Sequence, residues 1–275
     1  MGGASRAAPE GGGACLNCGA ARHGPFCHAC GQEDVDVGAP VSALAREAVR
    51  DGLSWDNRLL RTLRLLLAAP GALAEAWAAG RRAPFVPPVR LYFLLGAALL
   101  ALSAAEGWIA EGPEWDRAER GEAERERTAT NQAAYTVGRL IGTLGLNALL
   151  LLVPVVGFGY YALFKERRPV LAGHLVFAVH VASAALVVLV AWRAAVVVRL
   201  LVAPGAPPFV GSGRGVDLAL AAFLLGVSAY AALGARRFYG VGWGGATAAG
   251  LLVGLLPPVL LLTLVLVAAV VQALT

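Results

Sequence analysis

Charged residues are scarce in this chain. Only 15% of its 275 residues are Asp, Glu, Lys or Arg, whereas 58% are hydrophobic and the mean hydropathy is +0.66. Ordinary soluble domains carry about 25% charged residues. The composition therefore excludes an ordinary soluble domain and predicts an all-α integral membrane protein whose main partner is the lipid bilayer.

An export signal is also missing from the N-terminal region. A signal peptide has a basic start followed at once by an apolar stretch, but the first forty residues are rich in glycine, cysteine and charge. We therefore expect the N-terminus to stay in the cytosol.

Motifs that mark enzymes and nucleic-acid binders are absent as well. The sequence has no Gly-rich phosphate loop, no HExxH, no serine elbow and no paired carboxylates. Its net charge of +5 is spread along the chain without a basic cluster. We predict that the protein is not an enzyme and does not bind nucleic acid.

Cysteine is absent from the long hydrophobic part of the chain and occurs only in one short N-terminal stretch. The four cysteines form two CxxC pairs: Cys15, Cys18, Cys27 and Cys30. Two such turns can present four thiolates in the tetrahedron that Zn²⁺ prefers. Residues 15–32 are therefore predicted to form a zinc ribbon with a structural zinc ion, preceded by a disordered segment over 1–14.

Two further observations bear on this ribbon. Gly19 and Gly31 directly follow the pairs, where a turn needs positive φ to point amides at the sulfurs. His23 and His28 lie nearby, but four thiolates already complete the shell. The alternative is a pair of disulfides, which would require an oxidising compartment.

Residues 41–88 are predicted to form cytosolic or interfacial amphipathic helices that end in a proline elbow. Arginines recur at three-residue spacing opposite a leucine face formed by Leu59, Leu63, Leu66 and Leu67. Such a helix can lie in the headgroup layer or pack on the bundle, and the pattern fits both. The arginines expected at the membrane surface are Arg58, Arg61, Arg64, Arg81 and Arg82.

The rest of the chain, 89–275, reads as a transmembrane bundle. A helix needs about 20 apolar residues to cross the hydrocarbon core. Five stretches qualify: 89–108, 140–164, 170–192, 216–235 and 246–271. Arg193 and Arg199 favour an interfacial extension of the third span over a longer span. Basic residues gather at alternate ends of the helices, which places the N-terminus in the cytosol and the C-terminus outside.

Two histidines lie in the third predicted span. His174 and His180 are six positions apart, so their rings are about 120° apart around the helix and cannot easily share a metal ion. They either hydrogen-bond a neighbouring helix, through Thr143, Asn147 or a tyrosine, or form an intramembrane polar site. No carboxylate lies in the central part of a predicted span to complete a proton relay.

Several short motifs together resemble a known family. They are Cys30-Gly31-Gln32, Arg61-Thr62-Leu63, Pro70-Gly71, Gly80-x-Arg82 with Pro88, and the segment from His174 to His180. Their order and spacing are similar to those of the bacterial membrane proteins of domain of unknown function family 3667. The resemblance implies a zinc-ribbon N-terminus and a multi-pass body in the bacterial inner membrane, without an established activity. Gly173 and Ala182 depart from the family pattern, which has an acidic residue and a histidine there.

These observations favour a membrane-anchored interaction or regulatory protein whose ribbon meets a protein partner at the cytosolic face. The alternative is a transporter or channel-like protein that uses His174 and His180, although no internal repeat supports it. The GxxxG pair of Gly250 and Gly254 permits close helix approach and leaves a homo-oligomer open.

Overall fold

A computed structural model describes residues 13–33, 57–111, 152–203, 214–256 and 259. Within these ranges the chain forms seven helices and no named strand. The helices are α2 (Asn57–Ala68), α3 (Ala72–Ala78), α4 (Pro88–Glu111), Leu152–Phe164, α7 (Leu171–Val202), α8 (Arg214–Tyr239) and Trp243–Leu256. The expected all-α class is therefore confirmed for the described part of the chain, whereas the segment 1–14 lies almost wholly outside it.

Three of the described helices are long and apolar enough to cross a membrane: Pro88–Glu106, Leu171–Val202 and Leu218–Tyr239. They confirm three of the five predicted spans. The helix Leu171–Val202 runs unbroken through Arg193 and Arg199 and, at 32 residues, is about 48 Å long, well beyond the hydrocarbon core.

The other two predicted spans are described only in part. Leu152–Phe164 and Trp243–Leu256 are apolar helices of 10–17 residues. The remainder of both predictions, 140–151 and most of 257–271, lies outside the described residues. Neither of these two helices, over its described residues, is long enough to span the bilayer by itself.

Glycine and proline set the boundaries of the short helices. α2 ends before Pro70-Gly71, and Gly71 then takes a left-handed φ of 80°. Gly80 has a φ of 77° and ends α3, while α4 begins at Pro88, whose fixed φ suits a helix start. The predicted turn and proline elbow are thus where the sequence places them.

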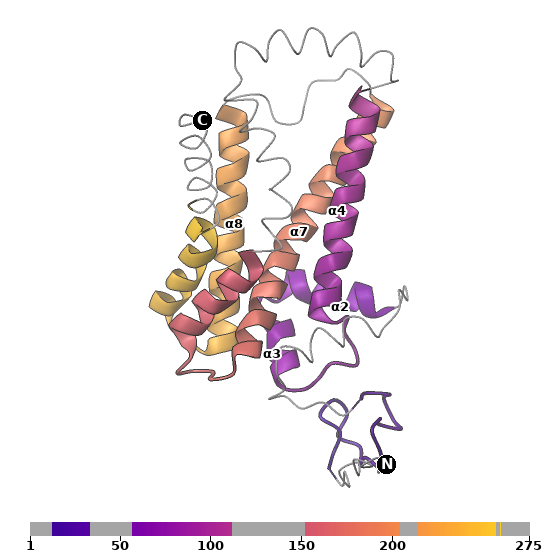
Figure 1. The fold of residues 1–275 in the computed structure, drawn as a ribbon, viewed down its shortest axis with the longest axis vertical. Coiled ribbons are helices and arrows are strands. Elements are labelled where there is room, and N and C mark those ends of the chain that lie inside the picture. The colour runs from indigo at the N-terminus through magenta and orange to yellow at the C-terminus, as the bar shows by residue number, and fades with distance from the viewer. Residues whose placement is uncertain (1–12, 34–56, 112–151, 204–213, 257–258, 260–275) are drawn as a thin grey trace, which may run out of the picture.

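The three long helices run along the long axis of the molecule (Figure 1). α4 and α7 both rise from the lower end of the molecule and pack against each other, whereas α8 descends. α2 and α3 lie at the lower end, and the ribbon of residues 13–33 lies beyond them. We call the helical part of the chain the body.

Two apolar clusters hold the body together. The first, which we call the aromatic core, joins α3, α7, α8 and both shorter apolar helices around Tyr160, Phe177, Phe238 and Tyr239. The second, the leucine core, joins α2, α3, α4 and α7. α3 belongs to both, because it contributes Trp77 to one and Leu73 to the other.

Glycines allow two close approaches between helices. A Cβ atom on Gly71 would lie 2.5 Å from the carbonyl oxygen of Gly234 in α8. A Cβ on Gly250 would lie 2.7 Å from the Ser228 carbonyl oxygen, and one on Gly254 would meet the Ser228 hydroxyl. The GxxxG pair therefore serves packing within the chain.

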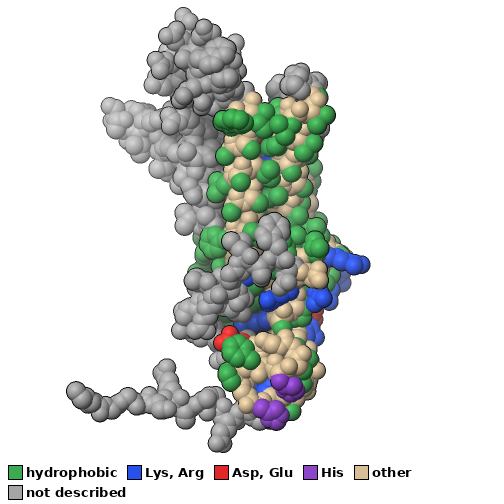
Figure 2. Space-filling model, turned by 90° about the vertical axis from the view of Figure 1, so that its right-hand side faces the viewer, with side chains coloured by type: hydrophobic (Ala, Val, Ile, Leu, Met, Phe, Trp, Pro, Cys, Tyr) green, Lys and Arg blue, Asp and Glu red, His purple; other side chains and the backbone are tan. Residues whose placement is uncertain are grey.

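Exposed cations gather where the helices meet the ribbon. Figure 2 shows hydrophobic side chains over the upper part of the molecule, Lys and Arg below them, and the ribbon at the lower end. The exposed cations at the lower ends of the helices are Arg61, Arg64, Arg81, Lys165, Arg167, Arg236 and Arg237. We call this set the basic belt.

Candidate metal centre and buried polar cluster

Each CxxC pair is closed by the same tight turn. The amide of Gly19 donates to the Cys15 carbonyl at 2.9 Å, and the amide of Gly31 donates to the Cys27 carbonyl at 2.8 Å. Gly19 and Gly31 have φ of 77° and 71°, as predicted. Only glycine adopts this conformation readily, so the two residues fix the geometry of the pairs.

A second hydrogen bond anchors each turn at its base. The Cys15 amide donates to the Ala20 carbonyl at 2.8 Å, and the Cys27 amide donates to the Gln32 carbonyl at 2.8 Å. An isolated antiparallel bridge follows in each case, between Ala14 and Ala21 and between Phe26 and Glu33. The ribbon thus consists of two equivalent knuckles.

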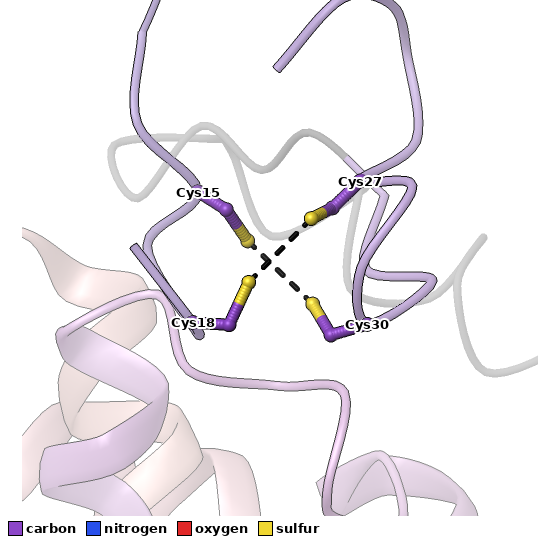
Figure 3. A group of neighbouring side chains, drawn as sticks. All are labelled: Cys15, Cys18, Cys27 and Cys30. Carbon is purple, nitrogen blue, oxygen red and sulfur yellow. Dashed lines mark hydrogen bonds between the residues drawn. The ribbon is translucent and has the colours of Figure 1, made fainter. Parts of the chain in front are cut away.

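The four sulfur atoms point to one centre (Figure 3). All lie within 4.8 Å of one another, with 3.7 Å between Cys15 and Cys30 and 3.5 Å between Cys18 and Cys27. A tetrahedron with zinc–sulfur bonds of 2.3 Å has edges of about 3.8 Å. All four cysteines are free, so the disulfide alternative is not adopted. The cluster can therefore bind a metal ion.

The thiols influence one another's ionisation. The Asn17 side chain and the Gln32 backbone lower the pKa of Cys30 to about 6. The pKa of Cys18 is raised to about 12: the Ala20 backbone lowers it, but the adjacent Cys27 and Cys30 thiols oppose its ionisation. Several adjacent thiolates cannot all carry charge without a compensating cation, which a metal ion bound at the centre would supply.

The ribbon histidines lie apart from the sulfur cluster. His23 and His28 stack with their ring centroids 6.0 Å apart, and both are exposed. Neither belongs to the four-cysteine group found among the described residues.

Gln32 attaches the ribbon to the body, a role that the sequence analysis missed. Its Nε2 donates to the Gly80 carbonyl at 2.7 Å, and its Oε1 accepts the amides of Arg82 and Ala83 at 3.0 and 3.1 Å. The side chain is buried. Its position directly after the turn glycine Gly31 was the only available signal, because the partners lie about fifty residues later in the chain.

His174 is buried in the aromatic core, and both of its ring nitrogens have partners. Nε2 lies 2.7 Å from the Arg168 carbonyl oxygen, and Nδ1 lies 3.0 Å from the Tyr239 hydroxyl. Because a carbonyl only accepts, Nε2 carries the proton, and the neutral ring then accepts from Tyr239. A tyrosine was among the expected partners, whereas Thr143 and Asn147 lie outside the described residues.

His180 differs from His174. Its Nδ1 lies 2.8 Å from the Val176 carbonyl oxygen one turn earlier, while its buried Nε2 has no hydrogen-bond partner among the described residues. The buried hydroxyl of Ser183, one turn further along α7, also has none within the part of the chain that the structure describes. The structure therefore does not join His174 and His180 into one polar site.

The arginines expected at the membrane surface occupy different environments. Arg61, Arg64 and Arg81 are exposed in the basic belt. Arg58 donates to the Phe85 carbonyl at 3.1 Å, and Arg82 lies 4.4 Å from the centre of the Trp77 ring.

The leucine face of α2 packs mainly against the other helices of the body. Leu66 is buried in the leucine core, and Leu59 and Leu63 pack against it, whereas Leu67 is half exposed. Leu60 is exposed beside Arg61 and Arg64. The outward face of α2 thus combines leucine and arginine.

A further ion pair was missed by the sequence analysis. Arg193 of α7 pairs with Glu106 of α4, at the end of the body opposite the ribbon. The two residues are 87 positions apart, so the pattern of either span alone gave no indication of the pair.

Comparison with known families bears on α2, α3 and the first part of α4. The family model of a protein of unknown function (DUF3667) matches residues 56–100. The matched segment includes neither the cysteines nor His174 and His180. No curated protein and no solved structure matches the chain. Over residues 56–100 the chain is thus similar to a family of proteins of unknown function.

Proposed function

We propose that the chain is a multi-pass protein of the bacterial inner membrane that holds a structural zinc ion in its N-terminal ribbon. The ribbon presents a docking surface to a protein partner in the cytosol, and the proposal includes no enzymatic reaction. The observation that carries it is the convergence of four thiol sulfurs beside the basic end of a membrane-spanning body.

Zinc is favoured by the ligand set. Four thiolates from two CxxC pairs are typical of structural zinc sites, and a closed shell leaves no position for a catalytic water. Among residues 13–33 only Cys15, Cys27 and Gln32 are buried, so the ribbon has almost no apolar core of its own. The metal would supply the folding free energy, about 10 kcal/mol or more in apparent terms.

The basic belt supports a cytosolic ribbon. Short loops rich in Lys and Arg remain on the cytosolic side of bacterial membranes. The belt lies on the ribbon side of the spans, so this rule favours a cytosolic ribbon, and a cytosolic ribbon would hold its thiols in a reducing compartment. Its arginines and the exposed Leu60 suit contact with anionic headgroups.

The free end of the ribbon supports a docking role. Phe26 is 59% exposed, and the stacked His23 and His28 are exposed with it (Figure 2). Aromatic side chains of this kind contribute strongly to protein interfaces. The partner that fits is therefore a protein with an apolar pocket.

Metal analysis of the detergent-purified full chain tests the zinc site. We expect one zinc per chain, lost in Cys27→Ser and retained in His28→Ala. Protein without bound zinc, or with the same zinc content in both variants, would refute the proposed centre.

Thiol labelling tests the orientation. After chelation, a membrane-impermeant maleimide should label the cysteines in inverted vesicles and not in right-side-out vesicles. The opposite result would place the ribbon outside the cell.

Site-directed crosslinking tests the docking surface. A photoreactive residue at position 26 should yield a specific protein adduct, whereas one at Leu220, an equally exposed apolar position on α8, should not. The same adducts at both positions, or none at position 26, would contradict the docking role.

Transport is the second candidate, because His180 and Ser183 each have a buried polar atom in α7 with no hydrogen-bond partner in the described ranges. Buried polar groups in a membrane are costly and often line a substrate path. Proteoliposome ion flux that falls in His180→Ala and persists in His174→Ala would support it. Equal flux in His180→Ala and wild type would remove its best residue.

A further inference from the structure

Both knuckles of the ribbon contact the same turn of the body. Gln32, from the second knuckle, makes three hydrogen bonds with Gly80, Arg82 and Ala83. Leu16, from the first knuckle, packs on Gly80 so closely that a Cβ there would lie 3.1 Å from the Leu16 Cβ. The Gly80–Ala83 turn is therefore held from two sides.

The residues that hold the turn are parts of the cysteine knuckles themselves. Leu16 directly follows Cys15, and the Gln32 carbonyl accepts the Cys27 amide that closes the second knuckle. The two knuckles meet through their sulfurs, and little else is buried in the ribbon. The relative position of Leu16 and Gln32 thus depends on whatever joins the four sulfurs.

The Gly80–Ala83 turn is the part of the body that the ribbon contacts. It lies between α3, which belongs to both apolar cores, and the proline elbow that starts α4. Just after the turn, α2 makes two hydrogen bonds with the same segment. The Arg58 side chain donates to the Phe85 carbonyl, and the Thr62 hydroxyl accepts the Val86 amide. A change at the turn therefore acts on the segment that positions the first span.

We infer that metal binding in the ribbon locks the Gly80–Ala83 turn through Gln32, so that metal occupancy is transmitted to the base of α4. The inference rests on the metal site of the proposed function and adds Gln32 as the residue that transmits its state. With metal bound, Oε1 of Gln32 accepts the Arg82 and Ala83 amides. When the metal leaves, the knuckles separate and both amides lose their acceptor.

Hydrogen exchange of the full chain in nanodiscs tests this inference on the peptide that spans residues 80–86. In zinc-loaded wild type, the Arg82 and Ala83 amides should be protected. Chelation should convert these two amides to fast exchange, by about tenfold, as expected for loss of part-buried hydrogen bonds. Protection should return when one zinc per chain is added back.

Two variants separate the contact from the metal site. Gln32→Ala should release the same two amides while zinc stays bound, because no thiolate is removed. His28→Ala changes an exposed ribbon side chain of similar size and should alter neither zinc content nor exchange.

The outcomes distinguish the inference from the proposed function. Amides that stay protected in Gln32→Ala or after chelation would overturn the inference while leaving the zinc site intact. Release of the amides in His28→Ala would overturn it too. A chain that binds no zinc would overturn the proposed function, and Gln32→Ala would then show separately whether the contact exists.

Discussion

The ribbon and the body keep their structures by different means. Among residues 13–33 only three side chains are buried, whereas the body contains two apolar cores with fully buried aromatic and aliphatic side chains. A segment as short as the ribbon cannot bury enough apolar surface to offset its chain entropy. The packing that holds the body together is therefore nearly absent from the ribbon, whose four cysteines could instead bind a metal ion.

The ribbon and the body also differ in how their polar groups are arranged. In the ribbon four sulfurs face one another and leave their shared centre for an ion. In the aromatic core, by contrast, His174 has partners for both nitrogens, from Arg168 and Tyr239. Four potential metal ligands that converge on one centre indicate a metal site, whereas a buried polar group with protein partners indicates a structural role.

The largest expected effect is the loss of one buried thiolate from the ribbon. Cys27→Ser should abolish zinc binding and unfold residues 13–33, because about 10 kcal/mol of apparent binding free energy is lost. The body should keep its helices, since its cores contain none of the cysteines. Zinc analysis together with circular dichroism checks both parts, and loss of helical signal would show that the regions are not independent.

Packing in the body is tested by adding one methyl group. Gly71→Ala places a Cβ 2.5 Å from the Gly234 carbonyl oxygen at a φ of 80°, so we expect a loss of about 2–5 kcal/mol in unfolding free energy. Gly96→Ala, in α4 where a Cβ would meet no described atom within 4 Å, should instead raise the unfolding free energy by about 0.5–1 kcal/mol. Unfolding in mixed micelles measures both, and equal shifts would contradict the close approach.

A buried hydroxyl of the body should have a smaller effect. Thr62 Oγ1 accepts the Val86 amide at 2.9 Å, so Thr62→Val leaves that amide unpaired at a loss of about 1–3 kcal/mol. Thr247→Val changes an exposed threonine that bonds the Gly244 carbonyl and should cost at most about 0.5 kcal/mol. The same unfolding assay compares them, and the reverse order would refute the role of Thr62.

The smallest effect is expected for the exposed ion pair between Glu75 and Arg237, whose Oε2 and Nε atoms lie 2.8 Å apart. Both side chains are more than 40% exposed, so solvent screens the pair. Glu75→Gln should lower the unfolding free energy by about 0.5 kcal/mol or less, and added salt should remove the difference. A loss above about 1 kcal/mol that persists in high salt would show a stronger link between α3 and α8.

Local patterns predicted the features that short segments determine alone. The two CxxC pairs with Gly19 and Gly31 gave the cysteine cluster, and apolar runs gave three confirmed spans. The α2 pattern left two interpretations open, and contacts with α3, α4 and α7 decided that most of its leucines pack inward. An amphipathic pattern shows that a face is apolar, without showing what covers it.

The amino-acid sequence by itself determined that three stretches can span the membrane and that four thiols lie close enough to share an ion, because length, hydrophobicity and short spacing suffice for both. Only the tertiary structure decided that Gln32 holds Gly80, that His174 meets Tyr239 and that Tyr230 bonds the Leu66 carbonyl. These pairs are 48 to 164 positions apart in the chain. Their partners are chosen by how whole helices pack, which no local pattern records.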